Sequence, residues 1–488
     1  MTIAAVIAEF NPFHNGHAYL AKMARELTGA DFVIAIMSGD YVQRGVPAIV
    51  DRETRCRMAL AAGYDLVLAY PTRFASASAE CFAAKAVEIL SHLGCVDYLV
   101  FGSENGDLTA LNVVADTLSD EPPTYKEALR RALKNGLSFP TARALALEEA
   151  LTSDSSLMKM EHSDVATLLS TPNNILALEY LKAIKRLKVN IKPVTITRAG
   201  QAYHDEALPD DDTQMPSASA IRAYLEAITS NGCCESSRII YRTTDTANAA
   251  HTNISGGNDK HLNNTLTGIP AEALTILEAD IRARGIMHEN DLSPILAEKL
   301  WSLTCPEDLM GIADMTVDLG NAIFKKRQTF TDFAAFAEVL KSKNLTRTRI
   351  NRALLHLTLG IRAQSSDPNG TAAISSVSPV MSTGSSSEPE SSESLNRNPV
   401  GDGLLYAQIL GFRKDKAALL KTITAQTDIP VITRPADGPA LLTGEALALF
   451  REEERVTNLY ESLRSMKSGQ AMRPALSRPV IVFMPAEP

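Results

Sequence analysis

The first 105 residues alternate short apolar runs with stretches in which apolar residues recur at helical spacing. The pattern predicts strands at 2–8, 31–37, 66–69 and 98–101, and helices at 17–28, 52–62 and 77–93. Strands that alternate with helices of this length are joined by crossovers, so they form a parallel sheet with helices on both faces. This part of the chain is expected to be an α/β domain of the doubly wound, Rossmann-like type.

Beyond residue 105 the pattern becomes mainly helical, with one more strand at 192–197 and a helix opening at 217–221. The Asn-, Thr- and Gly-rich stretch and the Ser-rich stretch that follow lack the apolar residues needed to offset their ordering entropy. The expected division is an α/β domain at 1–230, a polar linker or insertion at 231–267, a helical domain at 268–363, a Ser-rich disordered insertion at 364–402, and a C-terminal part of the helical region with a short strand at 403–488.

Length and composition agree with a soluble protein of at least two domains. A chain of 488 residues exceeds what one hydrophobic core supports, and 45% hydrophobic with 22% charged residues fits neither a disordered nor a membrane protein. The start of the chain has no basic segment of the signal-peptide kind, so we expect a cytoplasmic protein without a membrane partner. The six cysteines show no zinc-type spacing, and no metal-binding residues are expected.

The segment after the first strand carries the candidate chemistry. It consists of Ile7, Ala8, Glu9, Phe10, Asn11, Pro12, Phe13, His14, Asn15, Gly16, His17, Ala18, Tyr19 and Leu20. It lies where ligands of parallel sheets bind, and the HxGH spacing lets His14 and His17 present imidazole N–H groups to one point. Gly16 allows close approach, and the helix N-terminus adds amides and a positive dipole end. These groups suit the charge that builds on an α-phosphate when pyrophosphate is displaced, although two structural histidines near a turn are the alternative.

This motif resembles that of the HxGH nucleotidyltransferase superfamily, whose Rossmann-like domains activate a carboxylate or phosphate on ATP. Neither a Walker loop nor a GxGxxG fingerprint is present. The second superfamily signature is similar to Ser217, Ser219 and Arg222, which the resemblance places on the β- and γ-phosphates. A helix with an ordinary N-cap at Ser217 is the alternative.

Further stretches resemble the bacterial tRNA(Met) cytidine acetate ligases, namely 8–13, 37–45, 101–104, 171–176 and 197–198. The resemblance covers about residues 1–225 and resumes near 345–361. It implies that ATP lies on residues 7–20, with Gly102, Asn173 and Arg198 completing its pocket. It also implies that acetate is activated to acetyl-adenylate and passed to the exocyclic amine of the wobble cytidine in elongator tRNA(Met). Gln43 and Arg44 could face the acetate or the tRNA.

A basic strip on an otherwise acidic chain is the candidate tRNA surface. The formal net charge is −9, yet residues 325–362 hold only two acidic residues, Asp332 and Glu338. The basic residues there are Lys325, Lys326, Arg327, Lys341, Lys343, Arg347, Arg349, Arg352 and Arg362. We expect Lys343, Arg347, Arg349 and Arg352 to contact RNA phosphates, with a solvated helix face as the alternative.

The sequence thus predicts an ATP-dependent ligase with acetate and elongator tRNA(Met) as its partners, and no stable protein partner is evident. Mg²⁺ is expected to enter through the ATP phosphates, because no metal-ligand cluster is visible. Two alternatives stay open: an adenylyltransferase that makes a nucleotide cofactor, and a non-catalytic RNA-binding protein.

Overall fold

The computed structural model describes residues 1–104, 106–137, 139–153, 165, 168–197, 216–230, 268–342, 345–363 and 405–485. Its strands are β1 (Ile3–Ala8), β2 (Phe32–Ser38), β3 (Tyr41–Val42), β4 (Val46–Pro47), β5 (Leu66–Tyr70), β6 (Tyr98–Ser103), β7 (Lys192–Thr197), β8 (Ala407–Arg413), β9 (Val431–Ile432) and β10 (Ile481–Phe483). Its helices up to α11 are α1 (Asn15–Thr28), α2 (Arg52–Ala61), α3 (Thr72–Ala75), α4 (Ala79–His92), α5 (Leu108–Asp120), α6 (Pro123–Lys134), α7 (Phe139–Ser153), α9 (Pro172–Leu187), α10 (Ala218–Ser230) and α11 (Ala271–Arg284). The later helices are α12 (Ser293–Trp301), α13 (Val317–Lys326), α14 (Phe333–Leu340), α15 (Arg347–Leu359), α16 (Ala418–Gln426), α17 (Gly438–Leu441) and α18 (Gly444–Ser468).

The main sheet has eight strands, seven of them in the order β10-β8-β5-β2-β1-β6-β7, with β9 paired to β8. All pairings are parallel except the one between β5 and β8. The strand order reverses direction at β1, whose neighbours are β2 and β6. Crevices at such switch points, outside the carboxyl ends of the strands, are where sheets of this kind bind ligands.

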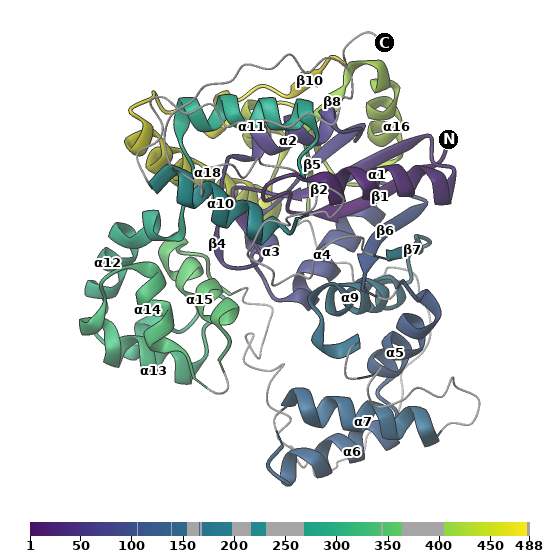
Figure 1. The fold of residues 1–488 in the computed structure, drawn as a ribbon, viewed down its shortest axis with the longest axis vertical. Coiled ribbons are helices and arrows are strands. Elements are labelled where there is room, and N and C mark those ends of the chain that lie inside the picture. The colour runs from purple at the N-terminus through teal and green to yellow at the C-terminus, as the bar shows by residue number, and fades with distance from the viewer. Residues whose placement is uncertain are drawn as a thin grey trace, which may run out of the picture.

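Alternate residues of the central strands pack on opposite faces of the sheet. In β1, Ile3 and Ala5 belong to the core under α4, α5 and α9, whereas Ala4 and Val6 belong to the core under α1, α2, α10 and α11. Both sets are almost completely buried, because helices cover both faces. Figure 1 shows these layers, with α1, α2 and α11 on one side of the strands and α4 and α9 on the other. The α6–α7 hairpin projects beyond the second layer (Figure 1).

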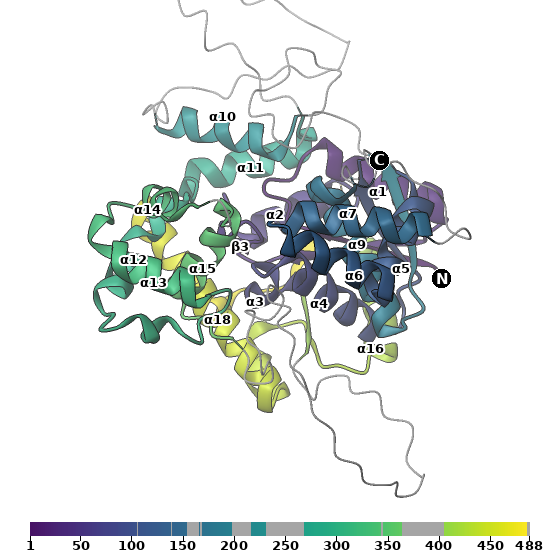
Figure 2. The same cartoon turned by 90° about the horizontal axis from the view of Figure 1, so that it is seen from below.

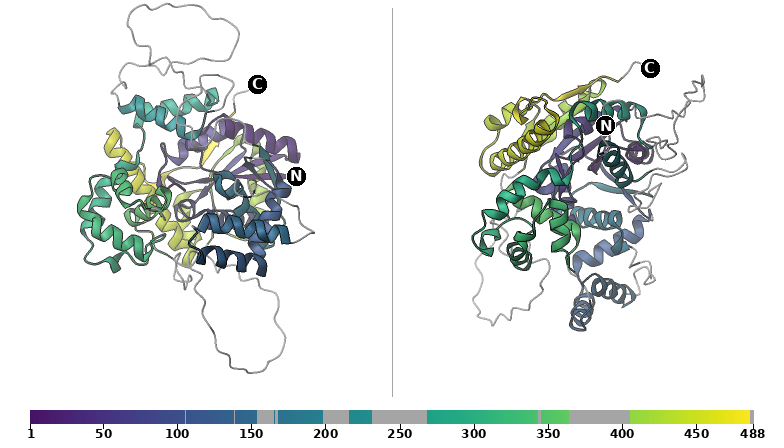
Figure 3. Two further views of the ribbon diagram at one scale, coloured as in Figure 1. Left: turned by 60° about the horizontal axis from the view of Figure 1, so that its bottom comes forward. Right: turned by 60° about the vertical axis from the view of Figure 1, so that its left-hand side comes forward.

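Helices α12 to α15 form a separate bundle beside the sheet domain (Figures 1 and 3). Its core is built around apolar residues such as Leu296, Ile323, Phe336 and Leu354, all fully buried. The long helix α18 supplies Val456 and Tyr460 to the same core and runs close to the bundle in Figure 2. A helix from the end of the chain therefore joins the bundle to the sheet domain.

The structure confirms the expected α/β sheet domain followed by a helical region. Strand 192–197 has the expected bounds, and the other predicted strands and helices in the first 105 residues are displaced by no more than two residues at either end. The short hairpin of β3 and β4 has only two residues in each strand and was not predicted.

Residues 405–485 differ from the expectation that 403–488 extends the helical region. They contribute β8, β9 and β10 to the main sheet, and β8 pairs directly with β5. The expected short strand exists as β10. Strand β8 was not predicted, because it is covered on both faces and so lacks the alternation of apolar and polar residues that marks a half-exposed strand. The predicted insertions at 231–267 and 364–402 lie outside the described residues. Within the described part of the chain, no helix is long and apolar enough to cross a membrane.

Candidate active site

A cavity opens at the carboxyl ends of β1 and β6, at the predicted edge of the sheet. Fifteen of the residues predicted for ATP line it: Ile7, Ala8, Glu9, Phe10, Asn11, His14, Gly16, His17, Tyr19, Leu20, Gly102, Asn173, Ser217, Ser219 and Arg222. Pro12, Phe13, Asn15 and Ala18 are not in its wall, because the turn and the helix direct their side chains elsewhere. Arg198 lies outside the described residues. The fold thus gathers segments from four distant parts of the chain around one cavity.

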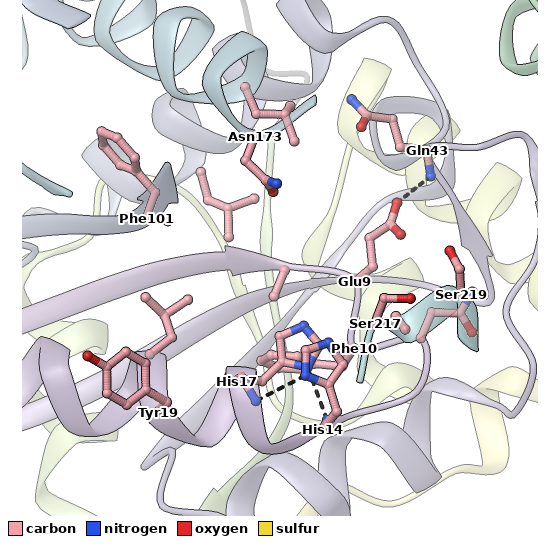
Figure 4. Close-up of a pocket in the computed structure, with 18 of the residues that line it drawn as sticks. Glu9, Phe10, His14, His17, Tyr19, Gln43, Phe101, Asn173, Ser217 and Ser219 are labelled. Atoms are coloured by element: carbon pink, nitrogen blue, oxygen red, sulfur yellow. Dashed lines mark hydrogen bonds between the residues drawn. The ribbon is translucent and has the colours of Figure 1, made fainter. Parts of the chain in front are cut away.

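The two histidines cap the helix that begins beside the cavity. Nδ1 of His14 accepts a hydrogen bond from the backbone N–H of Gly16 at 3.1 Å, and Nδ1 of His17 accepts one from the backbone N–H of His14 at 3.2 Å. Their rings stack with centroids 3.7 Å apart. A nitrogen that accepts carries no hydrogen, so each neutral ring must carry its hydrogen on Nε2. The capping geometry therefore favours the tautomer in which both rings are Nε2–H donors. Figure 4 shows the two capping hydrogen bonds as dashed lines.

Aromatic packing holds the His17 ring in place. Phe10 meets His17 edge to face at 4.9 Å, Phe13 lies at 5.4 Å, and both phenylalanines are fully buried. The hydroxyl of Tyr64 donates to the backbone carbonyl of His17 at 3.2 Å. Donors that are rigid before the reaction need no reorganisation when charge develops, which is the arrangement that lowers a barrier most.

Gly16 leaves no room for a side chain next to this pair. A Cβ at Gly16 would lie 2.9 Å from Cε1 and 3.0 Å from Nδ1 of His14. We therefore expect Gly16→Ala to displace the His14 ring. The rate of acetate activation on ATP, the reaction that the sequence predicts, should fall by roughly 10- to 100-fold. Alanine is a better helix former than glycine, so thermal stability should not fall for reasons of helix propensity. Steady-state kinetics with a parallel melting curve measures both, and an unchanged rate would contradict the steric argument.

Asn173 is held by Glu104, a residue that the sequence analysis did not single out. The amide nitrogen Nδ2 of Asn173 donates to Oε1 of Glu104 at 2.8 Å, and the backbone N–H of Asn174 donates to Oε2 at 2.9 Å. A carboxylate only accepts, so Asn173 must turn its NH₂ group toward Glu104 and keep its carbonyl oxygen for another partner. Glu104 also occupies the N-terminus of α9, which makes that end unsuitable for a phosphate.

The N-termini of α1 and α10 also lie at the cavity, and helix N-termini attract anions. Ser217 caps α10, since its Oγ accepts from the backbone N–H of Ala220 at 3.0 Å. Arg222, one turn later, donates to the carbonyl of Asn11 at 2.7 Å and to Oγ of Ser219 at 3.1 Å. Ser217 is thus both the ordinary cap and a residue of the cavity wall. Two helix N-termini and a guanidinium at one cavity form a site for a polyanion.

The hairpin of β3 and β4 closes the cavity on the side of the helical bundle. Gln43 and Arg44, in its loop, line the cavity, and the backbone N–H of Gln43 donates to Oε1 of Glu9 at 2.8 Å. Gly45 has φ 77°, and a Cβ there would lie 2.3 Å from the backbone N of Arg352. The loop therefore lies directly between the cavity and α15.

The basic strip is less free than its charge count indicated. Arg347 pairs with Glu338 and Glu289 at 2.5 and 3.0 Å, and Arg352 lies 3.4 Å from a carboxylate oxygen of Asp314. Arg349, by contrast, has no carboxylate partner among the described residues and is partly exposed. Lys343 lies outside the described residues. Glu289 and Asp314 lie outside residues 325–362, so the local charge count did not include them.

Several wall residues were not among the predicted site residues. They are Phe82, Phe101, Leu176, Tyr180, Ile196, Pro216 and Ala218. Leu176 and Tyr180 lie three and seven positions after Asn173 on α9, so the helical period could have found them. The others follow from tertiary packing.

Comparisons with known proteins show what the chain is similar to. A family model described as HIGH Nucleotidyl Transferase matches residues 1–376. The chain is 34% identical over 439 residues to the tRNA(Met) cytidine acetate ligase of Acetivibrio thermocellus, a match that covers 90% of this chain and 89% of that protein. It is 33% identical over 461 residues to the protein of the same name from Caldanaerobacter subterraneus, covering 94% and 95% of the two chains.

Solved structures show the same similarity over the whole chain. The apo crystal structure of Thermotoga maritima TmcAL matches with a TM-score of 0.78, and the form bound with alpha-thio ATP matches with 0.76. Each has 25% sequence identity and covers 99% of this chain and 100% of the other.

Proposed function

Since the chain belongs to the HIGH nucleotidyl transferases and, among them, to the tRNA(Met) cytidine acetate ligase family, we propose that it acetylates elongator tRNA(Met) at the expense of ATP. Acetate is activated to acetyl-adenylate with release of pyrophosphate. The acetyl group then passes to the exocyclic amine of the wobble cytidine, and AMP leaves. The observation that carries this proposal is the pair of Nε2–H donors, His14 and His17, at a cavity lined by two helix N-termini.

The cavity suggests how ATP lies. We place the phosphates at the starts of α1 and α10, near His14, His17, Ser217, Ser219 and Arg222, because helix N-termini and a guanidinium attract anions. The adenosine then lies toward Gly102 and Asn173. The NH₂ group of Asn173 donates to Glu104, so its carbonyl oxygen can accept a hydrogen bond from the amino group of adenine. We also assign Arg198 to the ATP-binding residues, because the sequence around it resembles that of the family.

The two histidines are the proposed catalytic residues of the first step. A carboxylate oxygen of acetate attacks the α-phosphorus as the bond to the pyrophosphate oxygen breaks. Negative charge grows on the phosphoryl oxygens, and the two Nε2–H groups are positioned to stabilise it. No covalent bond to the protein is needed. Mg²⁺ would neutralise phosphate charge, and we propose that ATP brings it in, since the described residues contain no group of three or more His, Cys, Asp or Glu able to hold a metal.

We propose that the tRNA approaches from the side of α15. Lys343, Arg347, Arg349 and Arg352 remain its candidate contacts. Of the three arginines, Arg349 alone has no carboxylate partner among the described residues. The loop of Gln43 and Arg44 lies between α15 and the cavity, so an acceptor bound along α15 would be next to the activated acetyl group.

Arg349 is expected to contribute most of the salt dependence among the described members of the strip. Arg349→Gln should reduce the slope of log affinity against log salt by about 0.7 to 0.9, the value for one lost phosphate contact. Arg347→Gln serves as the comparison and should change the slope less, because Glu338 and Glu289 already neutralise that guanidinium. Filter binding of tRNA across a salt series measures both. Equal slopes for Arg349→Gln and the parent protein would contradict the phosphate contact and favour the alternative, in which this face of α15 is only solvated.

The proposed reaction is tested by ATP–pyrophosphate exchange with purified protein. Exchange that requires acetate establishes acyl-adenylate chemistry, and digestion of treated tRNA should then yield acetylated cytidine. The assay is run with and without bulk tRNA, in case tRNA completes the site. Exchange without acetate would favour a cofactor adenylyltransferase, and its absence under both conditions would contradict the proposal.

A further inference from the structure

Glu9 is the only carboxylate among the described residues that line the cavity. The cavity otherwise offers cationic and N–H groups, including His14, His17 and Arg222. A carboxylate beside a polyphosphate repels it, at a cost that rises as water is excluded. Glu9 is therefore a poor ligand for ATP phosphates, even though it lies in the segment that surrounds them.

Two contacts hold Glu9 firmly, and within the described residues one oxygen of its carboxylate accepts no hydrogen bond. The guanidinium of Arg55 donates to the backbone carbonyl of Glu9 at 2.7 Å, and Oε1 accepts from the backbone N–H of Gln43 at 2.8 Å. No described residue donates to Oε2. A carboxylate fixed through one oxygen can accept a proton on the other.

Glu9 lies at the end of the cavity that faces the proposed tRNA surface. Figure 4 shows it beside Gln43 and Ser219, across the cavity from Tyr19 and Phe101. Gln43 belongs to the loop whose Gly45 packs against the backbone of Asn351 and Arg352 in α15. An acceptor that enters past this loop would reach the acetyl group near Glu9.

The second step requires a proton acceptor. The exocyclic amine of cytidine is a weak nucleophile because its lone pair is delocalised into the ring, and it carries a surplus proton once it has attacked. A base within hydrogen-bond reach of that proton removes it as the new bond forms. The described lining residues provide His14 and His17 as donors through Nε2, which leaves Glu9 as the acceptor.

We propose that Glu9 is the general base of the acetyl-transfer step. The amine nitrogen forms a bond to the carbonyl carbon of acetyl-adenylate, and the bond from that carbon to the phosphate oxygen breaks. AMP leaves with the electron pair, and the amine proton moves to Oε2 of Glu9 and from there to water. This inference rests on the proposed function, since it assigns a residue to the second half of that reaction.

The test separates the two half-reactions in Glu9→Gln. The amide of glutamine still accepts from the Gln43 N–H through its oxygen, so the loop should stay in place, but the side chain no longer takes up a proton. Acetyl-adenylate formation is followed by acetate-dependent pyrophosphate exchange and by trapping with hydroxylamine, a strong nucleophile that needs no base from the protein. Transfer is followed by acetylation of tRNA in a single turnover, with tRNA affinity measured separately. Glu26→Gln, an exposed carboxylate on α1, is the matched control.

In Glu9→Gln we expect exchange and hydroxamate formation within about threefold of the parent, and tRNA acetylation lower by about 10²- to 10⁴-fold. Glu26→Gln should leave both unchanged. An equal loss of both half-reactions in Glu9→Gln would overturn the inference and point to a role in the first step, such as holding Mg²⁺. Unchanged acetylation would also overturn it. Failure of the proposed function is distinguishable, because the parent protein itself would then show no acetate-dependent exchange.

Discussion

Removing the imidazole donors while keeping the helix cap is expected to lower acetate-dependent pyrophosphate exchange by about a hundredfold or more. The variants are His14→Asn and His17→Gln. Asparagine is among the best N-cap residues, and glutamine at the third helical position completes a capping box, so each can replace the bond now made by Nδ1. Asparagine is too short to place an N–H group where Nε2 of His14 lies. Glutamine keeps an amide N–H but loses the aromatic packing that orients the donor of His17. Loss of one oriented donor to developing charge costs about 10²- to 10³-fold in rate.

The measurement is exchange rate against melting temperature for each variant. If the histidines serve only to begin α1, both variants should melt and react like the parent protein. If they stabilise the transition state, the rate falls with the melting temperature preserved. A rate within twofold of the parent would contradict the catalytic assignment.

Replacing Arg464 with Met is expected to lower the free energy of unfolding by about 3 to 5 kcal/mol, the cost of breaking a buried ion pair on one side. Arg464, on α18, is fully buried and donates to Asp51 at 2.8 Å, to the carbonyl of Gly285 at 2.8 Å, and to Asp280. Burial alone would raise the pKa of Asp51, but Arg464 and Arg473 outweigh it and hold that pKa well below its usual range. Without Arg464 a buried carboxylate at the start of α2 loses its principal partner.

The matched control is Arg434→Met, which breaks the exposed pair between Arg434 and Asp437. An exposed pair contributes about 0 to 1 kcal/mol, so this variant should unfold near the parent. Urea titration monitored by circular dichroism measures both. Equal stability of Arg464→Met and the parent would mean that the contact of α18 with α2 and α11 does not depend on this arginine.

Local patterns were enough for the strands and helices of the first 105 residues and for the position of the candidate site. The strands of the sheet core are short apolar runs that the local pattern predicts. The HxGH segment lies between β1 and α1, so neighbouring residues indicate both the fold and the candidate chemistry. The comparisons confirm the family that these motifs indicated. The tautomer of the two histidines was not predictable, because it depends on backbone N–H groups that only the capped helix presents to Nδ1.

Long-range contacts decided the remainder. Strand β8 pairs with β5 across more than 300 residues of sequence, and no periodicity in 405–485 indicates its partner. Glu104 orients Asn173 although 69 residues separate them in sequence. Glu289 pairs with Arg347 across 58 residues. The sequence by itself thus determined the α/β class, the family and the edge of the sheet at which the cavity opens. Only the tertiary structure decided which charges are already paired, where the last strands insert and which carboxylate faces the cavity, because hydrogen bonds and ion pairs depend on distance in space and not on distance along the chain.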